Sequence, residues 1–268
     1  MEAGKRIPAV LSIAGSDSGG GAGIQADLKA FAACGVHGMT AITALTAQNT
    51  VGVNAVEVVP GEMIIAQVRA VAEDIGVDAV KIGMLATVET IEAVVEALDL
   101  VGDAPVVLDP VMVAESGAAL LDPGARAALI RLALPRAGVA TPNLPEAREL
   151  SGLGDAAGPE QLARAVKDLG PGAVVVTGGH GDDGADVFFD GTQMERIPGP
   201  SHPEGASHGS GCTHSSALAA RLARGDSPLE AARAARRIAA DAVAAGLREV
   251  GAGAGPVDAL GIGQAGKA

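Results

Sequence analysis

The chain has 268 residues, a formal net charge of −13 at pH 7 and no tryptophan or tyrosine. A chain of this length can bury a complete core, and we expect one α/β domain over residues 1–268. The acidic balance, without any Lys/Arg cluster, argues against nucleic acid and anionic membranes as partners. No apolar run approaches the roughly 20 residues that span a bilayer.

The two cysteines, Cys34 and Cys212, are expected to be free thiols. One bridge between them is conceivable, but nothing else in the sequence indicates secretion. The first residues lead directly into a strand-like segment rather than into a signal sequence. We therefore expect a cytoplasmic protein.

Strand-like and helix-period segments alternate along most of the chain. Short apolar runs predict strands at residues 9–14, 39–44, 53–59, 79–82, 106–108, 138–141 and 173–177, and an antiparallel hairpin of residues 185–189 and 193–196. Apolar spacing of three and four predicts helices at residues 24–31, 64–75, 88–98, 123–134, 212–224 and 228–247, with a loop after Gly251. The alternation predicts a mostly parallel sheet covered on both faces, with ligands at the carboxyl ends of its strands.

A glycine-rich loop, GSDSGGGAG at residues 15–23, follows the first predicted strand. It is not a P-loop, because no Lys-Ser/Thr pair follows the glycines, and its spacing fits the dinucleotide fingerprint poorly. The functional interpretation is a backbone wall that a flat small molecule approaches closely. A flexible strand-to-helix turn is the alternative.

Two side chains near this loop suit a nitrogen heterocycle. Asp27, on the helix that follows, is placed to accept a hydrogen bond from an amino group. Gln48, in the polar segment TAQNT, offers both a donor and an acceptor to a ring edge. A turn that satisfies its own backbone explains the polar segment equally well.

Acidic and amide side chains follow two later strands. Asp109 comes directly after the strand predicted at residues 106–108, where carboxylates commonly hold Mg²⁺ directly or through water. Asn143 and Glu146 lie three residues apart at a helix start and can order water around a nucleotide-bound magnesium. A capping box between these two residues is the competing interpretation.

The segment HGSGCT at residues 208–213 is a glycine turn that enters an alanine-rich helical pattern. We expect converging backbone N–H groups at Gly209, Ser210, Gly211 and Cys212. The helix that follows adds partial positive charge, so the turn favours an anion. Cys212 is expected at the first helical position, with a lowered pKa that lets its thiolate accept a proton.

Histidines near these turns leave a second interpretation open. The segment Thr177-Gly178-Gly179-His180 is another candidate glycine loop for phosphate groups. The five histidines of the chain show no metal-ligand spacing. A cysteine hydrolase would use Cys212 as nucleophile with His208 or His214 as base. The sequence identifies no third group to orient such a base.

Together these motifs resemble the hydroxymethylpyrimidine/phosphomethylpyrimidine kinases of thiamine biosynthesis, a branch of the ribokinase-like superfamily. The matching segments are residues 14–26, 45–50, 81–85, 107–116, 141–147, 178–180 and 208–216. They run in family order over almost the whole chain, and GSDSGGGAGIQAD together with TAQNT is the most specific match.

The resemblance implies a fold, a reaction and an assembly. The fold is a three-layer α/β/α sandwich around a central, mostly parallel sheet, and the assembly is a homodimer. The reaction uses ATP and Mg²⁺ to phosphorylate the hydroxymethyl group of 4-amino-5-hydroxymethyl-2-methylpyrimidine. A second phosphorylation converts the monophosphate to the diphosphate.

The resemblance also implies site residues. Around the pyrimidine it places Gly15, Ala22, Asp27, Gln48, Met84 and Val111. Around ATP and magnesium the expected residues are Asp109, Asn143, Glu146, Thr177, Gly179 and His208. Cys212 matches the position where sugar kinases of the superfamily carry a catalytic aspartate.

Three residues depart from the family pattern. Thr177 stands where the family usually has a lysine that contacts ATP phosphates, so a point charge is missing there. Ser210 replaces the usual threonine and keeps a hydroxyl group. His214 replaces a usual leucine and adds a titratable group close to the expected phosphates.

The expected mechanism is in-line transfer of the ATP γ-phosphoryl group to the pyrimidine CH₂–OH. Backbone N–H groups of residues 209–212 stabilise the developing charge, and the Cys212 thiolate accepts the hydroxyl proton. A pyridoxal or pyridoxine kinase is the nearest alternative, because it phosphorylates a hydroxymethyl group on another aromatic nitrogen ring. The other alternative is a non-catalytic pyrimidine-binding regulator that lost ATP binding because Thr177 replaces the usual lysine.

Overall fold

One sheet of nine strands runs through the part of the chain that the computed structural model describes, residues 6–178, 184–200, 202 and 205–265. The strands are β1 (Ala9–Asp17), β2 (His37–Asn49), β3 (Gly52–Val58), β4 (Ala79–Ile82), β5 (Val106–Leu108), β6 (Val139–Ala140), β7 (Ala173–Val176), β8 (Asp186–Phe189) and β9 (Met194–Ile197). Their order in the sheet is β3-β2-β1-β4-β5-β6-β7-β8-β9.

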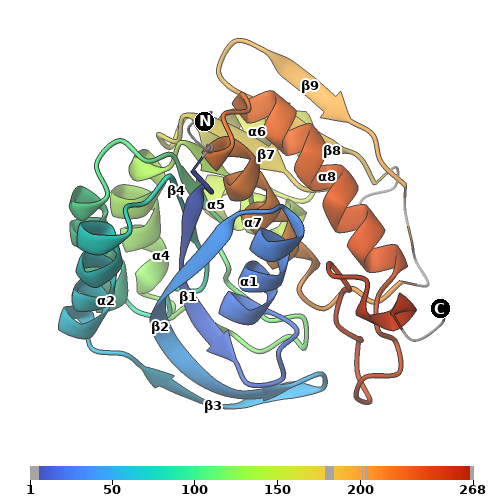
Figure 1. Cartoon of the computed structure of the whole chain (residues 1–268). Helices are drawn as coiled ribbons and strands as arrows, with labels where there is room; N and C mark the ends of the chain where they lie inside the picture. The colour runs from blue at the N-terminus through green and yellow to red at the C-terminus, as the bar shows by residue number, and fades with distance from the viewer. Residues whose placement is uncertain (1–5, 179–183, 201, 203–204, 266–268) are drawn as a thin grey trace, which may run out of the picture.

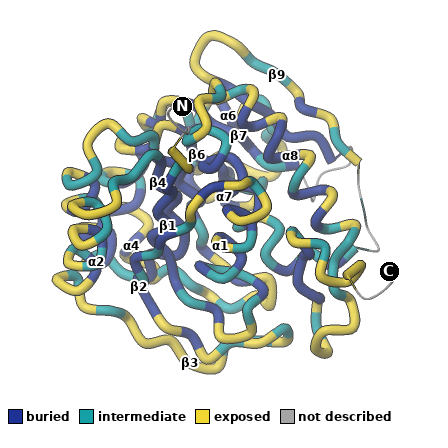
Figure 2. Tube along the Cα trace, viewed as in Figure 1, coloured by how far each residue is buried: buried dark blue, intermediate teal, exposed yellow. Residues whose placement is uncertain are grey.

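The sheet is parallel in its centre and antiparallel at both edges. Strands β2, β1, β4, β5, β6 and β7 pair in parallel, whereas β3 and the β8–β9 hairpin pair antiparallel to their neighbours. The central strands are covered on both faces, and the burial view shows β1 as largely buried and β3 as largely exposed (Figure 2). Apolar runs without alternation are what such doubly covered strands require.

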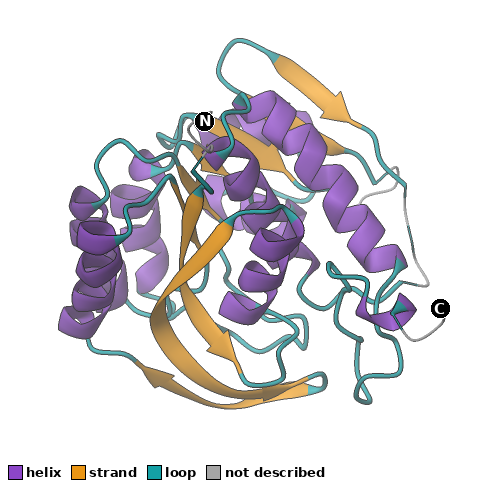
Figure 3. Cartoon of the chain, in the orientation of Figure 1, coloured by secondary structure: helices purple, strands orange, loops and turns teal. Residues whose placement is uncertain are grey.

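Helices cover the sheet on both faces, which confirms the three-layer α/β/α sandwich. They are α1 (Gly23–Ala33), α2 (Gly61–Asp74), α3 (Val88–Ala97), α4 (Ala125–Ala128), α5 (Leu144–Ser151), α6 (Pro159–Lys167), α7 (Ser210–Ala223) and α8 (Pro228–Ala244). Helices α1, α7 and α8 share one face (Figures 1 and 3), where Phe31, Leu218 and Ala231 pack on β-strand residues. On the other face Ile64, Ile91 and Leu162 bring α2, α3 and α6 into a second core.

Several elements differ from the sequence prediction. The helix expected at residues 123–134 is α4 followed by a π-helical turn, Leu129–Ala133, and a 3-10 turn, Leu134–Arg136. Helix α6 was not predicted, although its buried Leu162 and Val166 have helical spacing. Strand β1 continues to Asp17, because a bulge between Ala14 and Ser16 keeps it paired with β2. The first part of the glycine loop is therefore strand.

The chain after Gly251 is mostly loop, as predicted, and it is anchored beside the turn that precedes α7. The His208 N–H donates to the Gly255 carbonyl, and the Val257 N–H donates to the His208 carbonyl. A short 3-10 turn, Ile262–Gln264, follows. Within the described residues, no helix is both long and apolar enough to cross a membrane.

Candidate active site

A cavity of about 480 Å³ opens at the carboxyl ends of the central strands, beside the start of α7. This volume lies in the range of small-molecule sites. Of the expected pyrimidine contacts, the cavity is lined by Gly15, Ala22, Gln48, Met84 and Val111. Of the other expected residues, it is lined by Asp109, Asn143, Glu146, Thr177, His208, Gly209, Ser210, Gly211 and Cys212. Gly179 lies outside the described residues.

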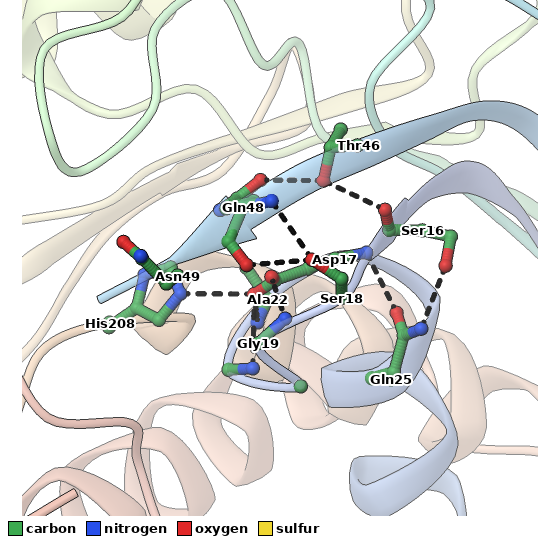
Figure 4. A network of polar contacts seen from close by, with 12 residues as sticks. Ser16, Asp17, Ser18, Gly19, Ala22, Gln25, Thr46, Gln48, Asn49 and His208 are labelled. Atoms are coloured by element: carbon green, nitrogen blue, oxygen red, sulfur yellow. Dashed lines mark hydrogen bonds and ion pairs between the residues drawn. The ribbon is translucent and has the colours of Figure 1, made fainter. Parts of the chain in front are cut away.

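Asp17 organises the glycine loop at one end of the cavity (Figure 4). Its Oδ1 accepts the Gly19 N–H at 2.7 Å, and its Oδ2 accepts the N–H groups of Gly21 and Ala22 at 3.0 and 2.8 Å. These hydrogen bonds and the nearby His208 outweigh burial and lower the pKa of Asp17. The carboxylate fixes the loop that carries Ala22.

The glycine loop and the turn before α7 approach each other too closely for side chains. A Cβ on Gly21 would lie 2.1 Å from the His208 ring, and a Cβ on Gly209 would lie 1.9 Å from the Gly21 carbonyl oxygen. Gly209 also has a φ of 84°, which disfavours other residues. Glycines at these two positions let the expected heterocycle side and the expected phosphate side share one cavity.

The residues expected around the pyrimidine combine an apolar contact with a polar side chain. A Cβ on Gly15 would lie 3.0 Å from the Met84 sulfur, so these two residues form a tight apolar wall. The Thr46 hydroxyl lies 2.9 Å from the Ser16 carbonyl oxygen, to which it donates, and 3.1 Å from the Gln48 side-chain amide (Figure 4). Met84 and Gln48 together suit a flat ring with polar substituents.

Asp27 does not contact the cavity, so the expectation of a hydrogen bond to substrate is wrong. It is fully buried, and Lys81 Nζ lies 2.9 Å from its Oδ1. The hydroxyls of Ser12 and Ser216 also donate to this carboxylate, at 2.6 and 2.7 Å. A buried carboxylate needs such partners. Asp27 therefore holds Lys81 in place, and Lys81 in turn lines the cavity.

Cys212 is the third residue of α7 rather than the first, and its pKa is not lowered. Burial raises the pKa of the thiol to about 12, while Lys81 favours the thiolate and Asp27 and Asp109 oppose it. The expected helix-terminus effect is outweighed because the sulfur is desolvated and flanked by two carboxylates. Cys212 is therefore a thiol at neutral pH in the free protein.

The backbone N–H groups at this helix start differ in availability. The Ser210 N–H donates to the Ser207 carbonyl at 2.9 Å, so this N–H is already paired in the free protein. The Gly211 and Cys212 N–H groups make no backbone hydrogen bond to the described chain and border the cavity. An unpaired pair of amides at a helix N-terminus favours an anion.

Two further buried carboxyl side chains, Asp109 and Glu146, line the cavity. The Ser215 hydroxyl of α7 donates to Asp109 Oδ2 at 2.9 Å, and burial raises the pKa of Asp109. Glu146 and Asn143 form the capping box at the start of α5, with bonds of 2.9 and 2.8 Å. Burial and the neighbouring Asp109 raise the pKa of Glu146 to about 8. The capping interpretation is confirmed, and both residues also line the cavity.

The opposite end of the cavity holds three charged or titratable side chains around Thr177. Asp186 at the start of β8 accepts the Gly178 N–H at 2.9 Å, and its other oxygen lies 3.0 Å from His214 Nε2. Arg236 of α8 lies on the other side of Asp186, with its Nε at 3.7 Å. Since His208 and His214 face Asp17 and Asp186, neither is oriented as the base of a cysteine hydrolase.

Sequence reasoning missed four buried residues that shape this site: Asp17, Lys81, Asp186 and Arg236. Asp17 stands inside the glycine loop that the motif analysis quoted, but only the loop's backbone was considered. Arg236 had a usable signal, because it stands on the buried face of a predicted helix among alanines. Such a position rarely accepts an arginine without a partner or a function.

The fold and the cavity together define the class. A helix N-terminus, buried carboxylates and a heterocycle-sized pocket meet at the carboxyl edge of a parallel sheet, as in the ribokinase-like small-molecule kinases. A family model described as phosphomethylpyrimidine kinase matches residues 17–258. The chain belongs to the phosphomethylpyrimidine kinase family.

Individual relatives agree with this assignment. A Rhizobium meliloti protein named hydroxymethylpyrimidine/phosphomethylpyrimidine kinase is 52% identical over 92% of this chain and 95% of its own length. A Geobacter sulfurreducens protein named thiamine biosynthesis bifunctional protein ThiED is 44% identical over 93% of this chain and 51% of its own. The structure of the Staphylococcus aureus pyridoxal kinase in complex with AMP-PCP is similar with a TM-score of 0.87 and 36% identity, over 96% and 95% of the two chains.

Proposed function

We propose that this chain transfers the γ-phosphoryl group of ATP to 4-amino-5-hydroxymethyl-2-methylpyrimidine and then to its monophosphate, in thiamine biosynthesis. The observation that carries the proposal is one cavity lined both by Gln48 and Met84 and by the helix start whose Gly211 and Cys212 N–H groups make no backbone hydrogen bond to the described chain. Gln48 and Met84 face the ring, and the amides of Gly211 and Cys212 face the transferring group. The pyrimidine kinase names of its relatives support this substrate.

In this proposal the protein's residues mainly position and stabilise. The Gly211 and Cys212 N–H groups donate to oxygens that gain charge in the transition state. The Cys212 thiol lies beside the substrate hydroxyl, and Lys81 beneath it favours the thiolate. Because phosphoryl transfer has a loose transition state, the hydroxyl proton leaves late and requires little base strength. Because Cys212 is a thiol in the free protein, its own proton must first pass to water when substrate and nucleotide bind. The thiolate that Lys81 favours then accepts the hydroxyl proton as the new O–P bond forms and the bond to ADP breaks.

A nucleotide-bound magnesium fits the acidic group at the cavity. Glu146 has a pKa raised to about 8, and burial and Asp109 are the causes. A positive charge close to Asp109 and Glu146 would offset the free-energy cost of ionising these two buried carboxyl groups. Asn143, the capping partner of Glu146, lies beside them. Within the described residues, no group of three or more His, Cys, Asp or Glu side chains is arranged to hold a metal. The ion would neutralise phosphate charge, and these residues would orient its water.

We further propose that the protein acts as a single domain, as a homodimer and in the cytoplasm. The single nine-stranded sheet of the described chain supports one domain. Leu45, Val56, Val58 and Met63 are exposed on and beside the β2–β3 ribbon, an apolar surface that a second copy can cover. The free thiols of Cys34 and Cys212 suit a reducing compartment. Light scattering of the purified protein and of Val56→Lys tests the dimer.

A pyridoxal kinase is the second candidate, because the Staphylococcus aureus pyridoxal kinase has a TM-score of 0.87 with this chain. One paired assay separates the possibilities: ATP consumption with hydroxymethylpyrimidine, and the same assay with pyridoxal. We expect turnover with the pyrimidine and a much smaller kcat/KM with pyridoxal. Faster turnover with pyridoxal would reverse the assignment, and pyrimidine binding without ATP consumption would indicate a non-catalytic regulator.

A further inference from the structure

The described lining of the cavity contains only two lysine or arginine side chains, Lys81 and Arg236. Lys81 is 2.9 Å from Asp27, and both side chains are fully buried, so its charge is already compensated. Thr177, at the far end, carries no charge. A bound triphosphate brings several negative charges into a protein whose own net charge is −13. Among the described lining residues, Arg236 is therefore the permanent cation that remains for phosphate groups.

Arg236 is held rigidly by backbone rather than by a close counter-ion. Its Nη2 donates to the Gly184 carbonyl at 2.7 Å and to the Pro200 carbonyl at 3.2 Å. A Cβ on Gly199 would lie 2.6 Å from Arg236 Nε, so a glycine leaves the room that the guanidinium occupies. The Arg236 Nε atom is buried and has no hydrogen-bond partner among the described residues. A buried donor without an acceptor leaves a hydrogen bond that a water, an ion or a ligand oxygen can complete.

Asp186 is the carboxylate paired with Arg236, but the two side chains are too far apart for a hydrogen bond. One of its oxygens accepts the Gly178 N–H at 2.9 Å, and the other lies 3.0 Å from His214 Nε2. The Arg236 Nε–Asp186 Oδ1 distance is 3.7 Å, longer than a charge-assisted hydrogen bond. Gly178 and His214 are thus closer to the carboxylate than Arg236 Nε is, although the His214–Asp186 contact is an ion-pair distance without hydrogen-bond geometry. The guanidinium therefore keeps donors for another anion.

We infer that Arg236 is the phosphate-binding cation of the nucleotide site, and that Asp186 and His214 are positioning residues that keep it available. The inference rests on the proposed kinase function and adds a specific binding residue to it. Arg236 takes over the charge that Thr177 lacks, from a different element of the fold. Its guanidinium can donate to two phosphate oxygens, which a lysine cannot do in the same geometry.

The test compares binding of a phosphate-bearing and a phosphate-free ligand by calorimetry. The ligands are a non-hydrolysable ATP analogue and adenosine, and the variants are Arg236→Gln and Arg237→Gln. Arg237 is the next residue, is exposed and does not line the cavity, so it controls for the charge change. We expect Arg236→Gln to weaken binding of the analogue about 10- to 100-fold and to leave adenosine binding unchanged. Arg237→Gln should bind both ligands as the wild type does.

Two results would overturn the inference. One is a folded Arg236→Gln protein that binds the analogue as tightly as the wild type does. The other is an equal loss of analogue and adenosine binding, which indicates a purely structural role. If Arg236→Gln does not fold, His214→Leu gives the same test with the guanidinium intact. Freed from His214, Asp186 should pair with Arg236 and weaken analogue binding several-fold, and unchanged affinity would contradict the proposal.

These readouts do not depend on turnover. A wild-type protein that consumes no ATP with hydroxymethylpyrimidine contradicts the proposed function. A wild-type protein that turns over, combined with normal analogue binding by Arg236→Gln, contradicts only the role of Arg236. The two failures are therefore distinguishable.

Discussion

His208 Nε2 lies 3.1 Å from Asp17 Oδ2, although 191 positions separate these residues in the sequence. Both side chains are buried, and each belongs to a turn that borders the cavity. The contact joins the glycine loop after β1 to the turn that starts α7 (Figure 4). In the proposed function this contact fixes the turn beside the pyrimidine relative to the turn beside the phosphate groups, which matters for a transfer that tolerates little misplacement.

Gly21→Ala should break this junction. Its Cβ would lie 2.1 Å from the His208 ring, so the loop or the histidine must move. We expect a lower melting temperature and a KM for the pyrimidine raised about tenfold or more. Gly124→Ala is the matched control, because a Cβ there meets nothing within 4 Å. Equal behaviour of the two variants would show that the close approach has no functional consequence.

Asp17→Asn should destabilise the loop through its backbone hydrogen bonds. The carboxylate accepts three N–H groups, and the amide cannot replace all of these acceptors. We expect a loss of about 1–3 kcal/mol in the free energy of unfolding. Since the pKa of Asp17 is lowered in the folded protein, its contribution is present above the ordinary value of 3.8 and is lost as pH falls through the folded pKa. Denaturant titrations at acidic and neutral pH should therefore show a difference between wild type and variant that shrinks in acid.

Lys81→Met should strongly lower the free energy of unfolding. It leaves Asp27 buried without its cation, and breaking a buried pair costs about 3–5 kcal/mol. The double variant Lys81→Met/Asp27→Asn removes the orphaned charge, while the asparagine can still bond with Ser12 and Ser216. Urea unfolding should show the double variant to be more stable than the single one. Additive losses would mean that the two side chains are not coupled.

Cys212 should react slowly with iodoacetamide at neutral pH. Burial raises its pKa to about 12, so the thiolate that alkylates is scarce. Cys212→Ala should bind the pyrimidine normally and lower kcat by on the order of 10²–10⁴. Mass spectrometry of Cys34 and Cys212 over time, together with kcat of the variant, checks both expectations. Rapid alkylation at neutral pH would contradict the raised pKa, and normal turnover would remove Cys212 from the mechanism.

The sequence predicted all nine strands of the described chain and most of its helices, and it predicted many of the residues that line the cavity. Apolar runs and glycine turns are local signals, and the elements around Gly15, Gln48 and Cys212 were found from them. The pyrimidine and kinase interpretation depended on several motifs in family order rather than on any one of them. The family match confirms it.

What the sequence did not predict depends on contacts between distant segments. Asp27 was assigned to the substrate because its chemistry suited an amino group, but Lys81 and Ser216 from other elements occupy it. The pKa of Cys212 was expected to be lowered from its helix position, whereas burial near Asp109 decides it. No local pattern reports which charges meet inside a fold.

Glu146→Gln should remove a pH dependence of stability. The folded protein holds the Glu146 proton up to about pH 8, because burial and Asp109 disfavour the carboxylate, whereas the unfolded chain loses it near the ordinary value of 4.5. Between these values the folded state binds more protons than the unfolded state, so the free energy of unfolding falls as pH rises. A glutamine has no proton to lose and can still accept the Asn143 N–H through its carbonyl oxygen. The variant should therefore gain stability relative to the wild type between about pH 5 and about pH 9, as calorimetric melting temperatures can show. Glu149→Gln, an exposed neighbour on the same helix, should show no such gain. A wild-type minus variant difference that stays constant over this range would mean that Glu146 is ionised in the folded protein.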